Sequence, residues 1–273
     1  MRLSQLGELG LLAELEQHGL ASQVENDVAQ LEAGLVVTQD ALIEDVHFRL
    51  DWLSWHELGF RAAAVNLSDL AASGAAPEAL VVTLALPGET ELDDVLALYE
   101  GLNEPGVPIV GGDTSRAEQV MLSVTALGRS DRVPGRGGAR PGDVLVVTGP
   151  LGAAGAAFRS NRLARPPIRL AEGRELASHA HAMLDISDGL AVDAGHIAGR
   201  SGVSCVIDLG RVPLAEGAQV EDLAFGEDFE LLAAVADPGR FTEIGLCEVG
   251  GGVVLWHEGA PVELGGWDHF QSA

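Results

Sequence analysis

Short apolar runs alternate with stretches of helical periodicity along most of the chain. Runs closed by Gly, Pro or Asp predict strands at residues 35–38, 79–86, 107–110, 120–127, 144–148, 203–209, 229–235 and 252–256. Apolar positions three or four residues apart predict helices at residues 55–74, 90–103, 170–183 and 188–200, and a helix start at 154–159. Thr90 and Asp93 form a capping pattern for the second helix. This order predicts an α/β or α+β fold.

The N-terminal 19 residues carry Glu8, Glu14 and Glu16 within an apolar pattern. This predicts an amphipathic helix and not a signal peptide. The longest apolar runs, at 79–87 and 144–147, have the length of strands and are too short to span a bilayer. We therefore expect no membrane partner.

A segment rich in Gly, Pro and Arg, residues 129–143, is the best candidate for a domain boundary. It predicts two domains, residues 1–135 and 136–273. The 273 residues are enough for two modest domains with their own cores.

The net charge of −25 argues against nucleic acid and anionic lipid as partners, because such a surface repels phosphates. Only Cys205 and Cys247 are present. Two isolated cysteines without an export signal predict reduced thiols and a cytoplasmic protein.

The chain contains no lysine, since all sixteen of its basic residues are arginine. A P-loop needs a lysine on the terminal phosphates, and protein kinases need one on a strand. Schiff-base catalysis through lysine is excluded as well. The absence of lysine excludes these mechanisms but does not indicate which other mechanism is used.

Carboxylates recur beside Gly, Ser, Thr and Asn near the predicted ends of elements. Taken singly, such residues are most often turn formers and helix caps. The members of this set are Asp27, Asp40, Glu44, Asp69, Asp113, Asp185, Asp188, Glu227 and Asp228.

Asp69 differs because it lies inside an apolar, alanine-rich helix. With Asn66 and Ser73 it forms one polar stripe at i, i+3 and i+7 spacing, and no arginine lies at helical spacing on that stripe. An ionised carboxylate on an apolar surface is costly unless a positive charge meets it. Hard oxygen ligands suit Mg²⁺. His179 and His181, two apart on the predicted helix, offer no zinc spacing and are expected at the surface.

A site lined by carboxylates repels anionic substrates unless several Mg²⁺ ions reverse the local charge. Glycines at 111–112 and 149–155 permit either close approach of backbone N–H groups to phosphate or simply tight turns. The residues alone leave these two possibilities open.

The chain carries, in order, the motifs DALIEDVHF, RAAAVNLSDLAASGAAP, IVGGDTS, RGGARPGDVLVVTG, LDISDGLAVDAGHIA, FGEDFELL and the terminal GGWDHF. Together these motifs resemble the thiamine-monophosphate kinase family, within the superfamily of aminoimidazole ribonucleotide synthetase and selenophosphate synthetase. The resemblance implies transfer of the ATP γ-phosphoryl group to thiamine monophosphate. It also implies a homodimer whose N-terminal domains share a β-barrel, with ATP held between domains.

The resemblance also assigns roles to individual residues. The implied Mg²⁺ ligands are Asp27, Thr38, Asp40, Asp69, Asp113, Asp185 and Asp188, of which Asp69, Asp113 and Asp188 are the expected catalytic set. The implied ATP contacts are Gly112, Asp113, Arg136 and Ser187, and the implied thiamine-phosphate contacts are His47, Glu227 and Trp267. From the residues themselves, His47 could equally be a structural histidine and Trp267 a packing anchor.

Three positions depart from the family pattern. Asn26 stands in place of a carboxylate, Gln39 in place of Thr or Ser, and Asp45 in place of Gly. They put the number of metal ions in question. Two alternatives follow: another ATP-dependent enzyme of the superfamily, such as an aminoimidazole ribonucleotide synthetase, or a non-catalytic nucleotide- or metal-binding relative. The missing N-terminal reactive cysteine argues against a selenophosphate synthetase.

Overall fold

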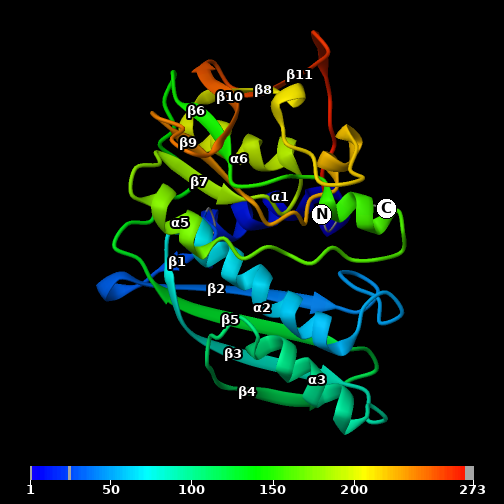
Figure 1. The fold of residues 1–273 in the computed structure, drawn as a ribbon. Coiled ribbons are helices and arrows are strands. Elements are labelled where there is room, and N and C mark those ends of the chain that lie inside the picture. The colour runs from blue at the N-terminus through cyan, green and yellow to red at the C-terminus, as the bar shows by residue number, and fades with distance from the viewer. Residues whose placement is uncertain (1, 24–25, 268–273) are drawn as a thin grey trace.

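The computed structural model describes residues 2–23 and 26–267 and shows two β-sheets, one above the other (Figure 1). The first sheet has the strand order β1 (Ala29–Gln30), β2 (Leu35–Ile43), β5 (Met121–Arg129), β3 (Ala76–Leu86) and β4 (Ile109–Arg116). Its pairs are antiparallel except β3 with β4, which are parallel. Residues 130–143, the segment that includes the expected boundary near residue 135, connect β5 of this sheet to β6 of the second sheet.

The second sheet has the strand order β12 (Ala260–Val262), β11 (Gly252–His257), β8 (Val203–Asp208), β10 (Thr242–Val249), β6 (Val144–Val147), β9 (Leu231–Val235) and β7 (Ala182–Asp185). The remaining elements are α1 (Leu3–Gln17), α3 (Leu92–Asn103), α4 (Ala153–Phe158), α5 (Leu170–Ala177) and α6 (Leu190–Ser201), with 3₁₀ turns η1 (Glu32–Gly34), η2 (Leu209–Arg211) and η3 (Val220–Ala224). Within the described part of the chain no helix is long and apolar enough to cross a membrane.

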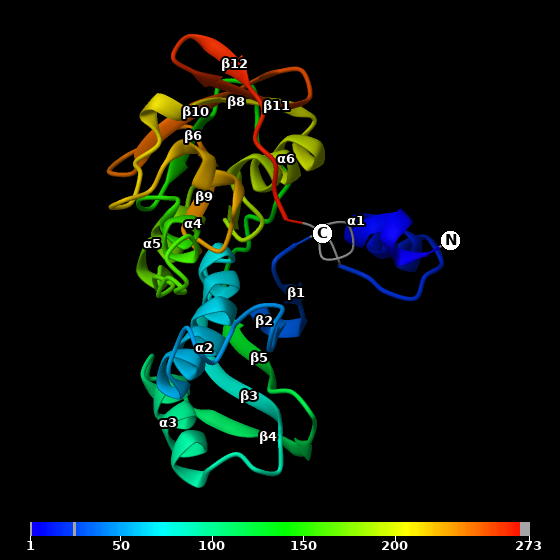
Figure 2. The ribbon, with the colours of Figure 1, turned by 90° about the vertical axis from the view of Figure 1, so that its right-hand side faces the viewer.

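Helix α2 (Trp55–Ala72) lies between the two sheets (Figures 1 and 2). Its N-terminus is capped reciprocally by Ser54 and Glu57, because each side chain bonds the other's backbone N–H, at 3.2 and 2.7 Å. Of its 18 residues, 14 are buried, so protein surrounds it on nearly every side. It packs on β2, β5 and α3 and also on α5, β7 and β9. The helix therefore belongs to the cores of both layers.

The sequence missed three features of the second layer. The helix expected at 170–183 ends at Ala177, and 182–185 is the buried strand β7, paired with β9. A four-residue apolar run does not distinguish a strand from a helix end. His179 and His181 therefore lie off the helix, and His181 Nδ1 is 2.8 Å from an Asp143 oxygen.

Strand β10 was not predicted, although it lies between β6 and β8. Its register shifts at Gly245, where a Cβ atom would lie 2.1 Å from the carbonyl oxygen of Val206. Only glycine fits this bulge, and glycine in an apolar run weakens the strand pattern. Strand β12 was missed too. The expected cap at Thr90 is also wrong, because α3 begins after Glu91 without a side-chain cap and has Asp93 and Asp94 in its first turn.

The strands expected at 35–38 and 107–110 are too short, because β2 runs on to Ile43 and β4 runs through the GGDTS segment to Arg116, whereas most of the other expected elements lie within about two residues of the observed ones. The N-terminal segment forms α1, interrupted at Gly7, and Gly202 ends α6 in the left-handed conformation. Cys205 and Cys247 are free thiols, buried opposite each other on β8 and β10.

Candidate active site

The face of α2 that carries the predicted polar stripe lies against β2. Thr38 Oγ1 donates a hydrogen bond to Asp69 Oδ2, and the backbone N–H of Asp40 donates to Asn66 Oδ1 at 3.1 Å. Strand β2 alternates, so Thr38 and Asp40 point to the same face, towards the helix. The stripe is therefore a contact surface between helix and strand, with Asp69 at its centre.

Two more carboxylates reach Asp69 from outside this pair of elements. Asp27 comes from the segment before β1, and Asp185 comes from the last position of β7. Carboxylate oxygens of Asp27, Asp69 and Asp185 lie within 4.8 Å of one another. Asp185 is also held to α2, because Ser68 Oγ donates to its Oδ2 at 2.6 Å. Distant segments thus converge on α2.

Burial and mutual repulsion make this cluster electrostatically costly. Burial raises the pKa of Asp69 well above its ordinary value, and the charges of Asp40, Asp185 and Asp27 raise it further. Burial and the charge of Asp27 raise the pKa of Asp185 to about 7, and burial is the main cause that raises the pKa of Asp40 to about 6. Because their pKa values are raised, these aspartates bind protons more tightly than isolated carboxyl groups do. Carboxylates that are metal ligands behave in this way when no cation is bound.

One arginine enters the cluster. Arg136 donates from Nη2 and Nε to Asp27 Oδ1 at 2.6 and 3.0 Å. Nevertheless burial keeps the pKa of Asp27 raised, against the opposing charge of Arg136. One guanidinium does not neutralise Asp27, Asp40, Asp69 and Asp185 together. Their hard oxygen donors, with Thr38, fit Mg²⁺.

Asn26 keeps a structural role. Its Oδ1 accepts a hydrogen bond from the backbone N–H of Arg136 at 3.2 Å. The amide of Asn26 therefore orients the segment around Arg136, although it carries no charge. Gln39 lies on the face of β2 away from Asp69, where its Oε1 accepts from Thr125 at 2.9 Å. Asp45 adopts the left-handed conformation, φ 62°, which explains the family's glycine there and which Asp tolerates better than most residues.

We expect Mg²⁺ to stabilise the fold more at pH 8 than at pH 5. The pKa values of Asp40 and Asp185 are raised in the fold, so their contribution to stability is present at low pH and is lost as pH rises through about 6 to 7. Cation binding opposes that loss and competes with protons. Thermal unfolding with and without Mg²⁺ at both pH values measures the effect, and an equal shift in Tm at the two would contradict it.

The loop before α6 is organised by Asp193, which the sequence did not single out. Its Oδ2 accepts the backbone N–H groups of Ser187, Asp188 and Gly189 at 3.0–3.1 Å. An acid in the first turn after a Ser-Asp-Gly loop is a capping pattern that could have revealed it. Asp188, Asp193 and His196 also place ligand atoms within 4.8 Å of one another. Asp188 therefore belongs to a second group of possible metal ligands, separate from the group of Asp27, Asp69 and Asp185.

The three acids of the GEDFE motif take different partners. The Asp228 carboxylate accepts the backbone N–H of Gly152 at 2.7 Å, and Glu230 accepts from Arg169 and from Thr148. Both are almost fully buried, whereas the Glu227 side chain is 25 % exposed. Glu227 is therefore the acid of this motif with access to a ligand. Its Oε2 lies 2.8 Å from Nη2 of Arg61 on α2.

Trp267 lies against the loop before α6, which Glu227 also contacts through its backbone N–H. Its backbone N–H donates to the carbonyl oxygen of Asp188 at 3.0 Å, and 44 % of the residue is exposed. That exposure favours a binding face over a buried anchor. The following Asp268, His269 and Phe270 lie outside the described residues. His47 occupies the turn after β2, where its Nδ1 accepts the Ile43 N–H at 3.1 Å, so the proton of the neutral ring is on Nε2.

Two expected phosphate-binding features lie elsewhere. The N–H groups in the 149–155 turn face the Asp228 carboxylate, so this turn is structural. Gly112 and Asp113 lie on β4, three strands from Asp40, a distance of about 14 Å. Asp113 is level with Thr83, Ser123 and Ala41, whose side chains point away from α2. Within one chain Asp113 does not join the cluster.

Comparisons with known proteins agree with this arrangement. Residues 25–130 match the AIR synthase related protein N-terminal domain, and residues 140–244 match the C-terminal domain. The fold and site thus define an AIR synthase related protein. Thiamine-monophosphate kinase of Aquifex aeolicus is 33% identical over 99% of this chain and 100% of its own, and that of Halobacterium salinarum is 35% identical over 92% and 96%. The chain belongs to the thiamine-monophosphate kinase family.

Solved structures give the same result. AaThiL complexed with AMPPCP and TMP superposes with a TM-score of 0.90 at 33% identity, covering 98% of this chain and 99% of that one. The hydrogenase maturation protein HypE in complex with ATP has a TM-score of 0.71 at 20% identity, covering 89% and 88%, and shares the fold alone. Membership of the family argues against the aminoimidazole ribonucleotide synthetase alternative.

Proposed function

We propose that this protein transfers the γ-phosphoryl group of ATP to thiamine monophosphate, giving thiamine diphosphate and ADP. The observation that carries the proposal is the cluster of Asp27, Asp40, Asp69 and Asp185, half-buried or buried beside one arginine in a chain without lysine. Such a cluster suits anionic substrates only when cations accompany them. The whole-length similarity to thiamine-monophosphate kinases supplies the acceptor.

No dedicated base is required for this reaction. A phosphate monoester has a second pKa of about 6, so the attacking oxygen is largely ionised at neutral pH. The chain's task is to align that oxygen with the γ-phosphorus and to exclude water. His47, Glu227 and Trp267 are our candidates for orienting the acceptor, and Arg136 and Ser187 are our candidates for ATP. Gly112 would contact ATP only from a second subunit, like Asp113 next to it.

Mg²⁺ would be held by Asp27, Thr38, Asp40, Asp69, Asp185 and Asp188, with Asp113 as a further ligand. When bound, it would supply positive charge that offsets the negative charge developing during transfer. Arg136 contributes in a second way, because a guanidinium with five donors retains free capacity for phosphate while it bonds Asp27. We place the reaction in the cytoplasm.

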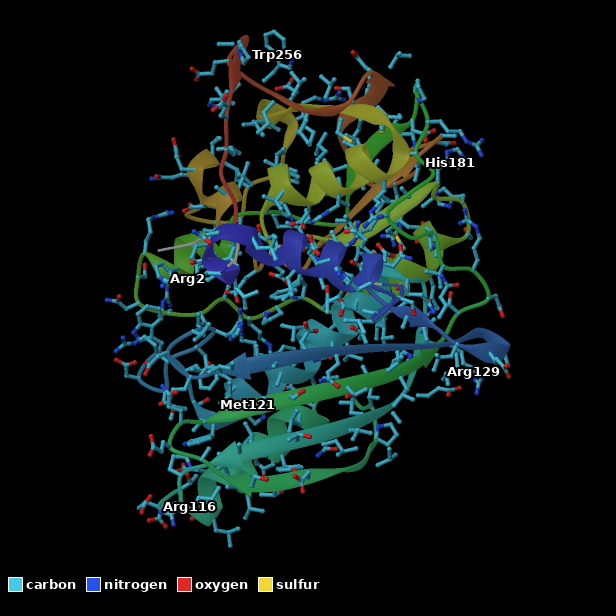
Figure 3. All side chains as sticks on the ribbon, turned by 180° about the vertical axis from the view of Figure 1, so that it is seen from behind. Arg2, Arg116, Met121, Arg129, His181 and Trp256 are labelled. Atoms are coloured by element: carbon cyan, nitrogen blue, oxygen red, sulfur yellow. The ribbon has the colours of Figure 1, made fainter. Side chains whose placement is uncertain are left out.

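We also propose a homodimer in which Asp113 completes the partner's site. The face of the first sheet opposite α2 carries apolar side chains, among them Val37, Ala41, Val81, Ala85 and Leu127. No helix of the described part covers this face, as the view from behind shows (Figure 3). Residues 110–116 of the edge strand β4 are all exposed. A long exposed edge favours pairing, and a shared barrel would cover both features.

The decisive assay for this activity is Mg²⁺-dependent ADP release with purified protein. Turnover with thiamine monophosphate, and none with aminoimidazole precursors, is the expected result. ATP binding without turnover on any acceptor would instead identify a non-catalytic relative.

Trp267→Ala is expected to raise KM for thiamine monophosphate about tenfold and to leave KM for ATP nearly unchanged. The reason is that the exposed indole offers a flat apolar face to the positive thiazolium ring, an attraction of about 1–2 kcal/mol. Steady-state kinetics with each substrate varied measures it. Equal increases for both substrates would assign Trp267 a packing role.

A further inference from the structure

Arg61 is a buried arginine that joins the two layers of the protein. It lies on α2, and its side chain is only 2 % exposed. Its Nη1 donates to the carbonyl oxygen of Ala164 at 3.0 Å, and its guanidinium carbon lies 5.7 Å from the centre of the Phe229 ring. Burying a guanidinium is costly unless a specific partner compensates.

The compensating charge is Glu227. Nη2 of Arg61 lies 2.8 Å from Glu227 Oε2. Nε and Nη2 nevertheless have no hydrogen bond of good geometry within the described part of the chain. The pair is thus held mainly by charge, in a low-dielectric environment where that attraction is strong. Glu227 is itself in the left-handed conformation, φ 55°, which a non-glycine residue keeps only when its surroundings hold it.

The same face of α2 reaches the carboxylate cluster of Asp27, Asp69 and Asp185. Ser68 follows Arg61 by seven residues, or about two helical turns, and bonds Asp185 at 2.6 Å. One rigid helix therefore contacts the acceptor loop at Arg61 and the carboxylate cluster at Ser68 and Asp69, about 10–12 Å further along. The spacing between these two points is fixed by helix geometry.

We infer that Arg61 is a positioning residue that orients the Glu227 carboxylate towards thiamine monophosphate and sets its distance from the carboxylate cluster. This inference rests on the proposed function of Glu227 as an acceptor contact. Arg61 itself is too buried to touch the substrate, so its effect must pass through Glu227.

The test compares Arg61→Met, Arg61→Lys, Glu227→Gln and the double variant Arg61→Met/Glu227→Gln. Arg61→Met should raise KM for thiamine monophosphate at least about tenfold while KM for ATP changes less than about twofold. Arg61→Lys keeps the charge and should restore part of the loss. The double variant should be no worse than the poorer single variant, since the two residues act as one unit.

Arg169→Met is the matched control. Arg169 immediately precedes α5 and pairs with Glu230, which lies three residues from Glu227 but is buried and does not contact Arg61. The Arg169→Met variant should lower Tm without raising KM for thiamine monophosphate more than KM for ATP. Parallel changes in both KM values for Arg61→Met, or additive effects with Glu227→Gln, would overturn the inference.

Calorimetric measurement of thiamine monophosphate binding distinguishes a failure of the proposed function from a failure of the role assigned to Arg61. Wild-type protein that binds none in Mg²⁺ would overturn the proposed function. Wild-type binding that Arg61→Lys and Arg61→Met both leave unchanged would overturn the role of Arg61 alone. Should Arg61→Met fail to fold, the same comparison is made with Arg61→Lys and Glu227→Gln.

Discussion

Asp69→Asn is expected to lower kcat about 100- to 1,000-fold or more while the fold survives. Asp69 is the acid at which β2, α2 and the other carboxylates meet. Asparagine keeps the shape and still accepts the Thr38 hydrogen bond, but it removes the charge that would hold a cation near the reacting phosphates. Activity at saturating Mg²⁺ equal to that of the wild type would show that Asp69 is no metal ligand.

The same substitution has an opposite effect on metal-free stability. The pKa of Asp69 is raised by burial and by neighbouring acids, so its ionisation destabilises the fold at neutral pH. Asp69→Asn should therefore raise Tm in EDTA by a few degrees and remove most of the Mg²⁺-induced increase. Asp131→Asn, a change of an exposed acid between the two sheets, is the control and should leave both values as in the wild type.

Mixing two inactive variants, Asp69→Asn and Asp113→Asn, is expected to restore activity. If each site combines Asp69 of one subunit with Asp113 of its partner, a mixed dimer contains one site with both acids intact. Random exchange makes about half of the dimers mixed, so about a quarter of wild-type activity should return. The register supports this arrangement, because Asp113 lies on the far face of the sheet from Asp69.

Activity is measured after co-refolding the two variants or after prolonged incubation, with each variant alone as the control. Size-exclusion chromatography must show a dimer in every sample. A dimer that regains no activity would place Asp113 in the site of its own chain, through a rearrangement, or outside the site altogether. A monomer would contradict the dimer.

The helix that carries Asp69 could be predicted because its pattern is long and strongly periodic. Residues 55–74 were expected as a helix, and α2 spans Trp55–Ala72. The Asn66–Asp69 stripe also pointed to a polar contact before its partners were known. The partners Thr38, Asp40 and Asp185 come from two different strands, and only tertiary packing brings them together.

Arg61 and Asp193 could not be recognised in the same way. In the sequence, Arg61 is a single polar residue near the start of an apolar helix. Its role depends on its contact with Glu227, which is far away in the sequence. Asp193 is significant because three backbone N–H groups turn towards it. The GEDFE acids looked equivalent in sequence, yet their partners separate one accessible carboxylate from two structural ones.

The position of α2 also bears on how substrates enter. The helix packs into both layers. A hinge motion that separated the layers would break the packing on one side of α2 and expose apolar surface on the helix and on the layer it leaves. Asp27 and Trp267, by contrast, lie on segments outside the helices and strands, before β1 and after β12 (Figure 2). We therefore expect substrates to reach the site without a rotation of one layer against the other.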